Sequence, residues 1–533
     1  MMIPYSTRRC TVTVMGALLA VTFASVMPRQ ASAADAPAES NAASRPNILL
    51  ICIDDLKPTI GCYGDPLAVT PNIDRLAAQG VRFDAAYCNQ AVCAPSRNSL
   101  LTGLRPQTLG IYDLPTNFRK AKPDAVTLPQ HFKNNGYRTE AFGKIFHVGH
   151  GNTNDVASWS TPHFRGKGDY ALAENRPEQG TREEALFTNV PPERANALPR
   201  GAPYESAEVE DEAYADGQVA ARAVERIAAA AQTPDEPFFL AVGFVKPHLP
   251  FCAPKKYWDL YDPAKFELAK LRQPPEGAPD FAPTDWRELR NYKGGPQTGP
   301  VDDAMQRQLI HGYYAATSYT DAQIGKVLDA LQANGPDKNT IIVLWGDHGW
   351  HLGDHGMWCK HTNYQQAARI PYIIDLPSDV RAGAASDELV ETVDLYPTLC
   401  ELAGLDLPYE LDGASLVTVL NDPKAHTDGV AFHVFPRGKL LGRAVRTDRY
   451  RLVEWKTPGA PAEEAILELY DYQTDPEESR NLAAEQPAVV AELRAILAKQ
   501  PEAKPQFVAK KGPGKAQGQG QGKKKRQRAA AKS

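Results

Sequence analysis

Cysteine is scarce in this sequence, with eight residues in a chain of 533. Cys10 lies in a stretch that we expect to be removed on export, and the seven that remain are an odd number, so one has no partner within the chain. Cys93 is conspicuous because Ala-Pro-Ser-Arg and the start of a predicted helix follow it directly. If Cys93 is chemically modified, six cysteines remain, and the sequence leaves open whether those six form disulfides.

Apolar runs long enough to span a membrane are also missing. The apolar stretch 12–26 is short for a span, follows two arginines and precedes Ala31-Ser32-Ala33, a small-residue cleavage site. These features predict a signal peptide over residues 1–33 and a linker over residues 34–44. We therefore expect an exported protein, periplasmic or extracellular, with no membrane span.

Acidic residues are missing from the C-terminal end. From residue 503 onward the chain has ten Lys or Arg and no Asp or Glu. Without these ten positive charges and the three of the signal peptide, the net charge of −5 becomes about −18 for the body between them. Residues 503–533 are poor in apolar side chains, so we predict a basic disordered tail. It is either a solvated tail or a tether for a polyanion such as a glycan, and we expect no nucleic-acid partner.

No internal repeat is evident, and the body shows an alternation of strand and helix patterns. Four nearly continuous apolar runs are typical of buried parallel strands, and they begin at Arg45, Glu236, Asn339 and Arg369. Helical patterns beginning at Thr70, Asp216 and Asp321 lie between them. The alternation predicts an α/β fold class, with a central, mostly parallel sheet sandwiched by helices, over a domain of residues 45–421.

The pattern changes after residue 421. Short alternating runs followed by a helical pattern predict a smaller C-terminal α+β domain with an antiparallel sheet over residues 422–502. Two stretches of the first domain, 166–200 and 274–300, have weak periodicity and are expected to be long surface loops. Loops of that length often shape a substrate site.

Ionisable residues follow three of the predicted parallel strands. They are Asp54-Asp55, Lys246 with His248, and Asp347-His348. Ligands in such sheets bind beyond the carboxyl ends of the strands. Adjacent strand residues face opposite ways, but a turn after the strand can aim both carboxylates inward. Three carboxylates favour a hard divalent cation, Ca²⁺ or Mg²⁺, over zinc, and the HExxH motif of zinc proteases is missing.

Further cations suit a bound oxyanion next to such a metal. The candidates are Arg97, Lys144, His147, Lys246, His248 and Lys360. Cys93 precedes a helix N-terminus, where a thiolate or a bound anion is favoured. A thiol nucleophile alone does not explain the acids, the metal and the arginine around it.

These motifs resemble those of the sulfatase family. "CAPSR" from Cys93 is similar to its C-x-P-x-R signature, in which the cysteine is oxidised after translation to formylglycine. "GKIFH", "KPHLPF" and "GDHGWHLGDHGMWCK" extend the resemblance over nearly the whole mature chain, and the motifs look most similar to those of iduronate-2-sulfatases. The resemblance implies an alkaline-phosphatase-like fold, a formylglycine-generating enzyme as partner and a sulfated polysaccharide or oligosaccharide as substrate.

The resemblance also assigns roles to residues. The implied ligands of one Ca²⁺ ion are Asp54, Asp55, Cys93, Asp347 and His348. The implied catalytic residues are Cys93, Arg97, Lys144, His147, His248 and Lys360, and those implied to bind the sulfate are Lys246, His248 and Lys360. Arg97 would hold the formylglycine hydrate, and His248 would be the general acid. The hydrate would attack sulfur, and its second hydroxyl would then expel sulfate.

We therefore expect an exported enzyme that hydrolyses a sulfate ester, with a 2-O-sulfated uronic acid as the expected substrate. A phosphate or phosphonate monoester hydrolase of the same superfamily is an alternative, because tetrahedral oxyanions are alike. A non-catalytic protein that binds sulfated glycans is another, for which the metal ligands would be dispensable.

Overall fold

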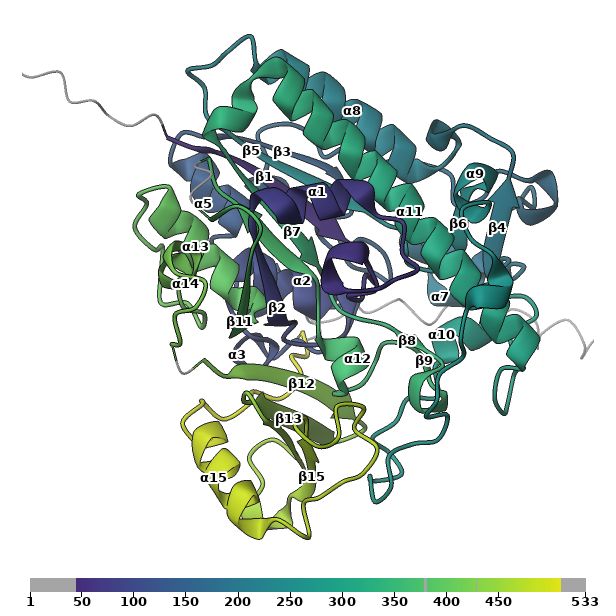
Figure 1. Ribbon diagram of the computed structural model, residues 1–533, viewed down its shortest axis with the longest axis vertical. Coiled ribbons are helices and arrows are strands. Elements are labelled where there is room, and N and C mark those ends of the chain that lie inside the picture. Colours follow the sequence, from purple (N-terminus) through teal and green to yellow (C-terminus); the bar gives the residue numbers. More distant parts are fainter. Residues whose placement is uncertain (1–44, 378–380, 428, 510–533) are drawn as a thin grey trace, which may run out of the picture. The chain divides into compact units, whose positions relative to one another are not determined.

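The computed structural model describes residues 45–377, 381–427 and 429–509, so the predicted signal peptide, the linker up to residue 44 and residues 510–533 of the predicted tail lie outside the described residues. A seven-stranded sheet forms its centre (Figure 1), in the order β11-β2-β10-β7-β1-β5-β3. Its strands are β1 (Asn47–Ile53), β2 (Val81–Tyr87), β3 (Arg138–Gly143), β5 (Phe238–Phe244), β7 (Thr340–Gly346), β10 (Tyr372–Asp375) and β11 (Ala384–Glu391).

The sheet is mostly parallel, as predicted, with one exception. β1 pairs in parallel with β7 and β5, β3 with β5, and β11 with β2, whereas β10 runs antiparallel to β2 and β7. The sequence predicted a parallel strand at β10, and that prediction was wrong. After β7 the chain stays at the carboxyl end of the sheet, where the N–H of Gly346 donates to the Pro371 carbonyl, so it re-enters from the same side.

Helices cover both faces of the sheet (Figure 1). Leu49, Ile51 and Ile53 of β1 pack under α1 (Pro71–Gln79), α8 (Ala215–Ala230) and α11 (Asp303–Asn334). The alternate residues of β1 pack under α2 (Cys93–Thr102), α5 (Leu128–Asn134) and α13 (Leu395–Leu402). Both faces of β1 are therefore buried, which explains its continuous apolar run.

α11 begins much earlier than the pattern from Asp321 predicted. Asp302 is its N-cap, and the Asp302 side chain accepts a hydrogen bond from the N–H of Met305. Tyr313, in the first half of α11, holds the backbone around Asp55, one of the predicted metal ligands. The Tyr313 hydroxyl donates to the Asp55 carbonyl at 2.8 Å and accepts from the N–H of Lys57 at 2.9 Å.

The C-terminal region forms the predicted antiparallel sheet. Its strands pair in the order β12 (Ala431–Arg437), β13 (Leu440–Arg446), β14 (Tyr450–Lys456) and β15 (Ile466–Asp471). α15 (Pro487–Leu497) packs on it through Val490, Leu493 and Leu497. Arg437 of β12 donates to the His361 carbonyl at 2.6 Å, so this sheet holds a loop that carries one of the predicted catalytic residues.

Short elements make up most of the connections. The helices are α3 (Pro106–Leu109), α4 (Phe118–Ala121), α6 (Arg182–Phe187), α7 (Pro192–Ala195), α9 (Lys255–Trp258), α10 (Arg287–Arg290), α12 (Gln365–Ala368) and α14 (Val417–Asn421). The strands are β4 (Tyr204–Ala207), β6 (Phe251–Pro254), β8 (His351–Leu352) and β9 (Trp358–Cys359). Among the helices of the described ranges, none combines the length and the apolar character that crossing a membrane requires.

The first residues of the predicted tail pack against the first domain. Ala503 is buried, the N–H of Lys504 donates to the Gln107 carbonyl, and that of Phe507 donates to the Gly110 carbonyl. The structure thus differs from the prediction at residues 503–509, because backbone hydrogen bonds to the region after α2 hold a segment that composition marks as solvated. In the described part of the chain, all seven cysteines are unpaired.

Candidate active site

Both carboxylates after β1 point into one site, because the chain turns at the strand end. Asp55 has a φ of 60°, a left-handed conformation that Asp tolerates better than most residues. Its N–H donates to Asp347 Oδ1 at 3.0 Å, and Asp347 follows the neighbouring strand β7. Asp54, Asp55 and Asp347 are all fully buried. The turn therefore brings Asp54 and Asp55 together with Asp347, which lies almost 300 positions later in the chain.

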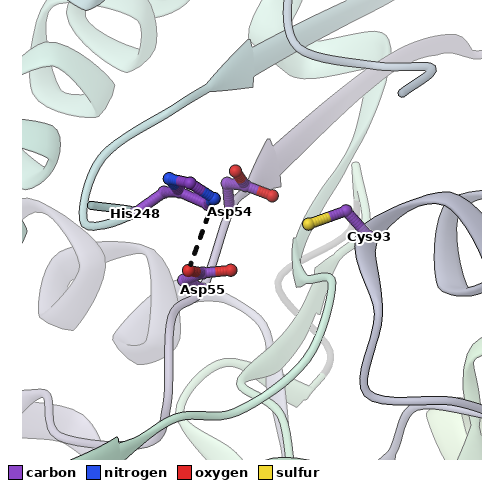
Figure 2. Close-up of side chains that lie close together, drawn as sticks. All are labelled: Asp54, Asp55, Cys93 and His248. Carbon is purple, nitrogen blue, oxygen red and sulfur yellow. Dashed lines mark ion pairs between the residues drawn. The ribbon is translucent and has the colours of Figure 1, made fainter. Parts of the chain in front are cut away.

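Cys93 is the first residue of α2 and faces these acids. Figure 2 shows its sulfur directed toward the carboxylates of Asp54 and Asp55, with His248 on their far side. Cys93 Sγ lies 3.4 Å from His348 Nε2 and 3.8 Å from Lys144 Nζ. Burial raises the pKa of the Cys93 thiol well above its usual value, and the Asp54 carboxylate adds to the effect. A free thiolate is therefore disfavoured here, which argues against an unmodified Cys93 thiol as the nucleophile.

The acids and imidazoles fit a metal ion. Asp54, Cys93, Asp347 and His348 each place one potential ligand atom within 4.8 Å of the others, and Asp54, Asp55, Cys93 and His248 form a second such group. Burial and the nearby Asp54 raise the pKa of Asp347 to about 7, and burial lowers that of His348 to about 4. A cation would favour ionised Asp347, and His348 is already the neutral imidazole that ligation requires. The oxygen-rich set suits a hard divalent cation.

Arg97 lies behind the acids. Its Nε donates to Asp347 Oδ2 at 3.0 Å and its Nη2 to Asp54 Oδ1 at 3.1 Å, while Nη1 donates to the carbonyls of Lys144 and Ile145. All three nitrogens are therefore occupied, and the guanidinium is fully buried. In this structure Arg97 positions the acids, whereas the resemblance assigned it to the nucleophile itself.

Lys144 and His147 come from the end of β3. Lys144 Nζ pairs with Asp54. Burial opposes ionisation of Asp54, but Lys144, His248 and Arg97 outweigh it and hold the pKa of that carboxyl well below its usual range. His147 Nε2 lies 3.1 Å from Nδ1 of His150. Burial, reinforced by Lys144, lowers the pKa of His147 well below its usual value, so this imidazole is neutral.

Lys360 and His248 share a carboxylate that the sequence did not reveal. Lys360 Nζ lies 2.9 Å from Asp55 Oδ2 and 3.0 Å from Glu288 Oε2, and His248 Nε2 lies 3.1 Å from Glu288 Oε1. The other ring nitrogen of His248 contacts the Leu249 carbonyl. Burial works against ionisation of Glu288, but Lys360 and His248 hold the pKa of its carboxyl well below its usual value. An ionised acid therefore lies between Lys360 and His248, two of the three residues predicted to bind the sulfate.

Lys246 is the predicted site residue that the structure places elsewhere. Its Nζ donates to the carbonyls of His248 and Pro250, at 3.2 and 2.7 Å. The side chain lines a neighbouring cavity that also contains Asp169. Lys246 thus holds the backbone around His248 instead of facing Cys93.

A cavity of about 360 Å³ lies over Cys93. His147, His248 and Lys360 line its floor together with Cys93. Its outer wall comes from the two stretches that the sequence marked as long loops, and includes Arg182, Leu186, Phe187, Glu288, Asn291 and Tyr292. In the sequence these stretches are marked by weak periodicity alone, and none of their residues was a candidate because they carry no motif.

Phe187 of this wall contacts His248 of the floor and two further residues, His150 and Lys144. Its ring lies 5.7 Å from that of His248 and 5.5 Å from that of His150, and Lys144 Nζ lies 5.3 Å from its centre. These edge-to-face and cation–π contacts seat α6 on the floor of the cavity.

Comparisons with known proteins agree with this geometry. The family model described as "Sulfatase" matches residues 46–405, and that described as "N-sulphoglucosamine sulphohydrolase, C-terminal" matches residues 353–503. The iduronate 2-sulfatase of Mus musculus is 37% identical over 410 residues, which cover 70% of this chain and 72% of that protein.

Two solved structures share the fold at 22% sequence identity. One is a protein in complex with its substrate D-glucosamine-2-N,6-O-disulfate, with a TM-score of 0.65 over 85% of this chain and 97% of that chain. The other is a phosphonate monoester hydrolase of Agrobacterium radiobacter, with a TM-score of 0.66 over 86% of this chain and 96% of that chain.

Proposed function

Since the chain belongs to the sulfatase family and is a sulfuric ester hydrolase, we propose that it is an exported enzyme that removes the 2-O-sulfate of a uronic acid in a sulfated polysaccharide or oligosaccharide. Its fold is the predicted alkaline-phosphatase-like sulfatase fold. The similarity to an iduronate 2-sulfatase supports the proposed substrate class. One observation carries the proposed chemistry: Cys93 is buried at the floor of a cavity, against three carboxylates and His348.

The proposed cofactors are one Ca²⁺ ion and the formylglycine that a formylglycine-generating enzyme makes from Cys93. Asp54, Asp55, Asp347 and His348 would hold the ion together with the modified residue 93. When bound, the ion and the formylglycine hydrate supply an activated oxygen nucleophile next to the sulfate ester.

The side chains around this centre have separate tasks in the proposed mechanism. Arg97 keeps the Asp54 and Asp347 carboxylates in place without contacting the substrate. Lys360 binds sulfate oxygens, whose negative charge it neutralises. His248 gives a proton from Nε2 to the sugar oxygen that leaves, and for this Nε2 must exchange its contact with Glu288 for the substrate.

The first test is the mass of the proteolytic peptide that contains Cys93, from protein produced with and without a formylglycine-generating enzyme. We expect a lighter, aldehyde-reactive peptide only when that enzyme is present. An unmodified thiol under both conditions would overturn the proposed nucleophile.

The second test measures sulfate release by the converted protein from defined oligosaccharides, including 2-O-sulfated uronates and other sulfated sugars. Matched phosphate esters are the comparison. Preference for the phosphate esters would favour the phosphoesterase alternative, and glycan binding without turnover would favour the binding protein.

A further inference from the structure

The outer wall of the cavity contains one arginine to which the mechanism gives no task. Arg182 is the first residue of α6, lines the cavity over Cys93, and has a side chain that is 20% exposed. A capping box fixes the start of this helix, because the Thr181 hydroxyl accepts from the N–H of Glu184 while the Glu184 carboxylate accepts from that of Thr181. The backbone that carries Arg182 is thus well defined.

The other cationic and imidazole side chains at the cavity are already engaged or neutral. Lys360 pairs with Asp55 and Glu288 and is the residue assigned to the sulfate, and Lys144 pairs with Asp54. Two further histidines line the cavity, and burial lowers the pKa of His150 to about 4 and that of His361 to about 3. Neither imidazole carries a charge near neutral pH, so neither can pair with a second anion.

Arg182 still has donors to offer. Nε donates to Asn196 Oδ1 at 2.8 Å, and Nη1 forms an ion pair at 3.4 Å with Oε1 of Glu183, which lines the same cavity. The second oxygen of Glu183 accepts from the N–H of Gly201 at 2.9 Å, so this acid is partly occupied by the backbone. Within the described part of the chain, Nη2 makes no hydrogen bond. One edge of the guanidinium is therefore available to a ligand in the cavity.

We propose that Arg182 binds the carboxylate of the sulfated uronic acid, as a second anion site in the cavity that also contains the sulfate site. The inference rests on the proposed function, because a 2-O-sulfated uronate carries two anions and needs a cation for each. A guanidinium fork matches the planar carboxylate with two parallel hydrogen bonds. The cavity of about 360 Å³ is in the range of small-molecule sites and has room for a sugar ring between its floor and its wall.

The test compares two substrates that differ only in this carboxylate. One is a 2-O-sulfated uronic acid disaccharide, and the other is the same disaccharide with the carboxyl group reduced to a hydroxymethyl group. Wild-type enzyme is compared with Arg182→Gln and Arg182→Lys. Arg194→Gln is the matched control, since Arg194 lies on the same stretch, is exposed and is absent from the cavity lining.

For wild type and Arg194→Gln, we expect kcat/KM for the uronic acid disaccharide to exceed that for the reduced disaccharide by about 10- to 100-fold. This is the gain in binding that a charge-assisted hydrogen-bonded pair typically contributes. In Arg182→Gln this preference should disappear, through loss of activity on the acid alone. Arg182→Lys should keep part of the preference. Thermal unfolding of each variant shows whether α6 stays folded.

The outcomes separate this inference from the function on which it rests. If Arg182→Gln keeps the wild-type preference, or loses activity equally on both substrates, the carboxylate site is refuted while the proposed substrate stands. If the wild type hydrolyses an aryl sulfate but neither disaccharide, the proposed substrate class fails and the carboxylate site fails with it.

Discussion

The floor and the outer wall of the cavity differ in how they are built. The floor rests on the carboxyl ends of β1, β3, β5 and β7 and on the start of α2, and the acids and Arg97 that support it are fully buried. The wall comes from the short helices α6 and α10, where the side chains of Arg182 and Glu288 are 20% and 21% exposed. The floor is thus held by the sheet, whereas the wall depends on a few contacts made by loops.

This difference suggests a division of labour. Residues of the floor and the acids beneath it hold one another through charge-assisted hydrogen bonds while buried, so each substitution should damage the chemistry itself. Wall residues touch the floor from outside, as Phe187 does, and substitutions there should change the choice or orientation of the substrate. The predictions below test this division, beginning with the floor.

Replacing Cys93 should have the largest effect. Cys93→Ala removes the proposed precursor of the nucleophile, and we expect sulfate release to fall by roughly 10⁴-fold or more with an unchanged melting temperature. Cys88→Ala is the matched control, because Cys88 is equally buried but its sulfur contacts the Ala367 carbonyl and not the site. If Cys93→Ala and the wild-type enzyme released sulfate at comparable rates, Cys93 would not be the source of the nucleophile.

Arg97→Lys should damage both stability and activity. One ammonium group cannot make the contacts of Arg97 with Asp54, Asp347 and two carbonyls, and buried charges that lose their partner cost about 3–5 kcal/mol of unfolding free energy. Urea unfolding and sulfate release measure the two effects. Arg105→Lys serves as the control, since Arg105 pairs with buried Glu391 away from the cavity and should lose stability but keep activity in the folded protein.

Removing the proposed Ca²⁺ ion should make the stability depend more strongly on pH. The pKa of Asp347 is about 7 in the folded protein against an ordinary 3.8, so between these values the folded chain holds a proton that the unfolded chain has released. The free energy of unfolding of the metal-free protein should therefore fall as the pH rises from 4 to 7. Melting temperatures at pH 5 and pH 8 should differ more for metal-free than for Ca²⁺-loaded protein, and Asp347→Asn should abolish that excess.

Glu288→Gln should have the smallest effect of the series. The amide keeps the shape but removes the charge shared by Lys360 and His248, so we expect kcat to fall by about 10-fold with little change in melting temperature. Asp285→Asn is the control from the same stretch, because Asp285 is exposed and pairs with Arg287. A loss of kcat as large as that of Cys93→Ala would show that Glu288 takes part in the chemistry, as the floor residues do.

Much of the floor could be predicted from the sequence because strands end where apolar runs end. Asp54, Asp347 and His248 follow such runs directly, and parallel strands bring their carboxyl ends to one edge. Lys246 follows the same run as His248, yet its side chain points to a neighbouring cavity. Position at a strand end therefore predicts the neighbourhood of a side chain but not its direction.

The sequence alone determined the alternation of strands and helices, the separate antiparallel sheet and the residues at the carboxyl edge, because burial imposes a periodicity that local composition records. Only the tertiary structure decided the antiparallel direction of β10, the role of Arg97 behind the acids, and the wall that brings Arg182 and Glu288 over Cys93. These features depend on contacts between segments far apart in the chain, and such contacts leave no periodic pattern in the sequence.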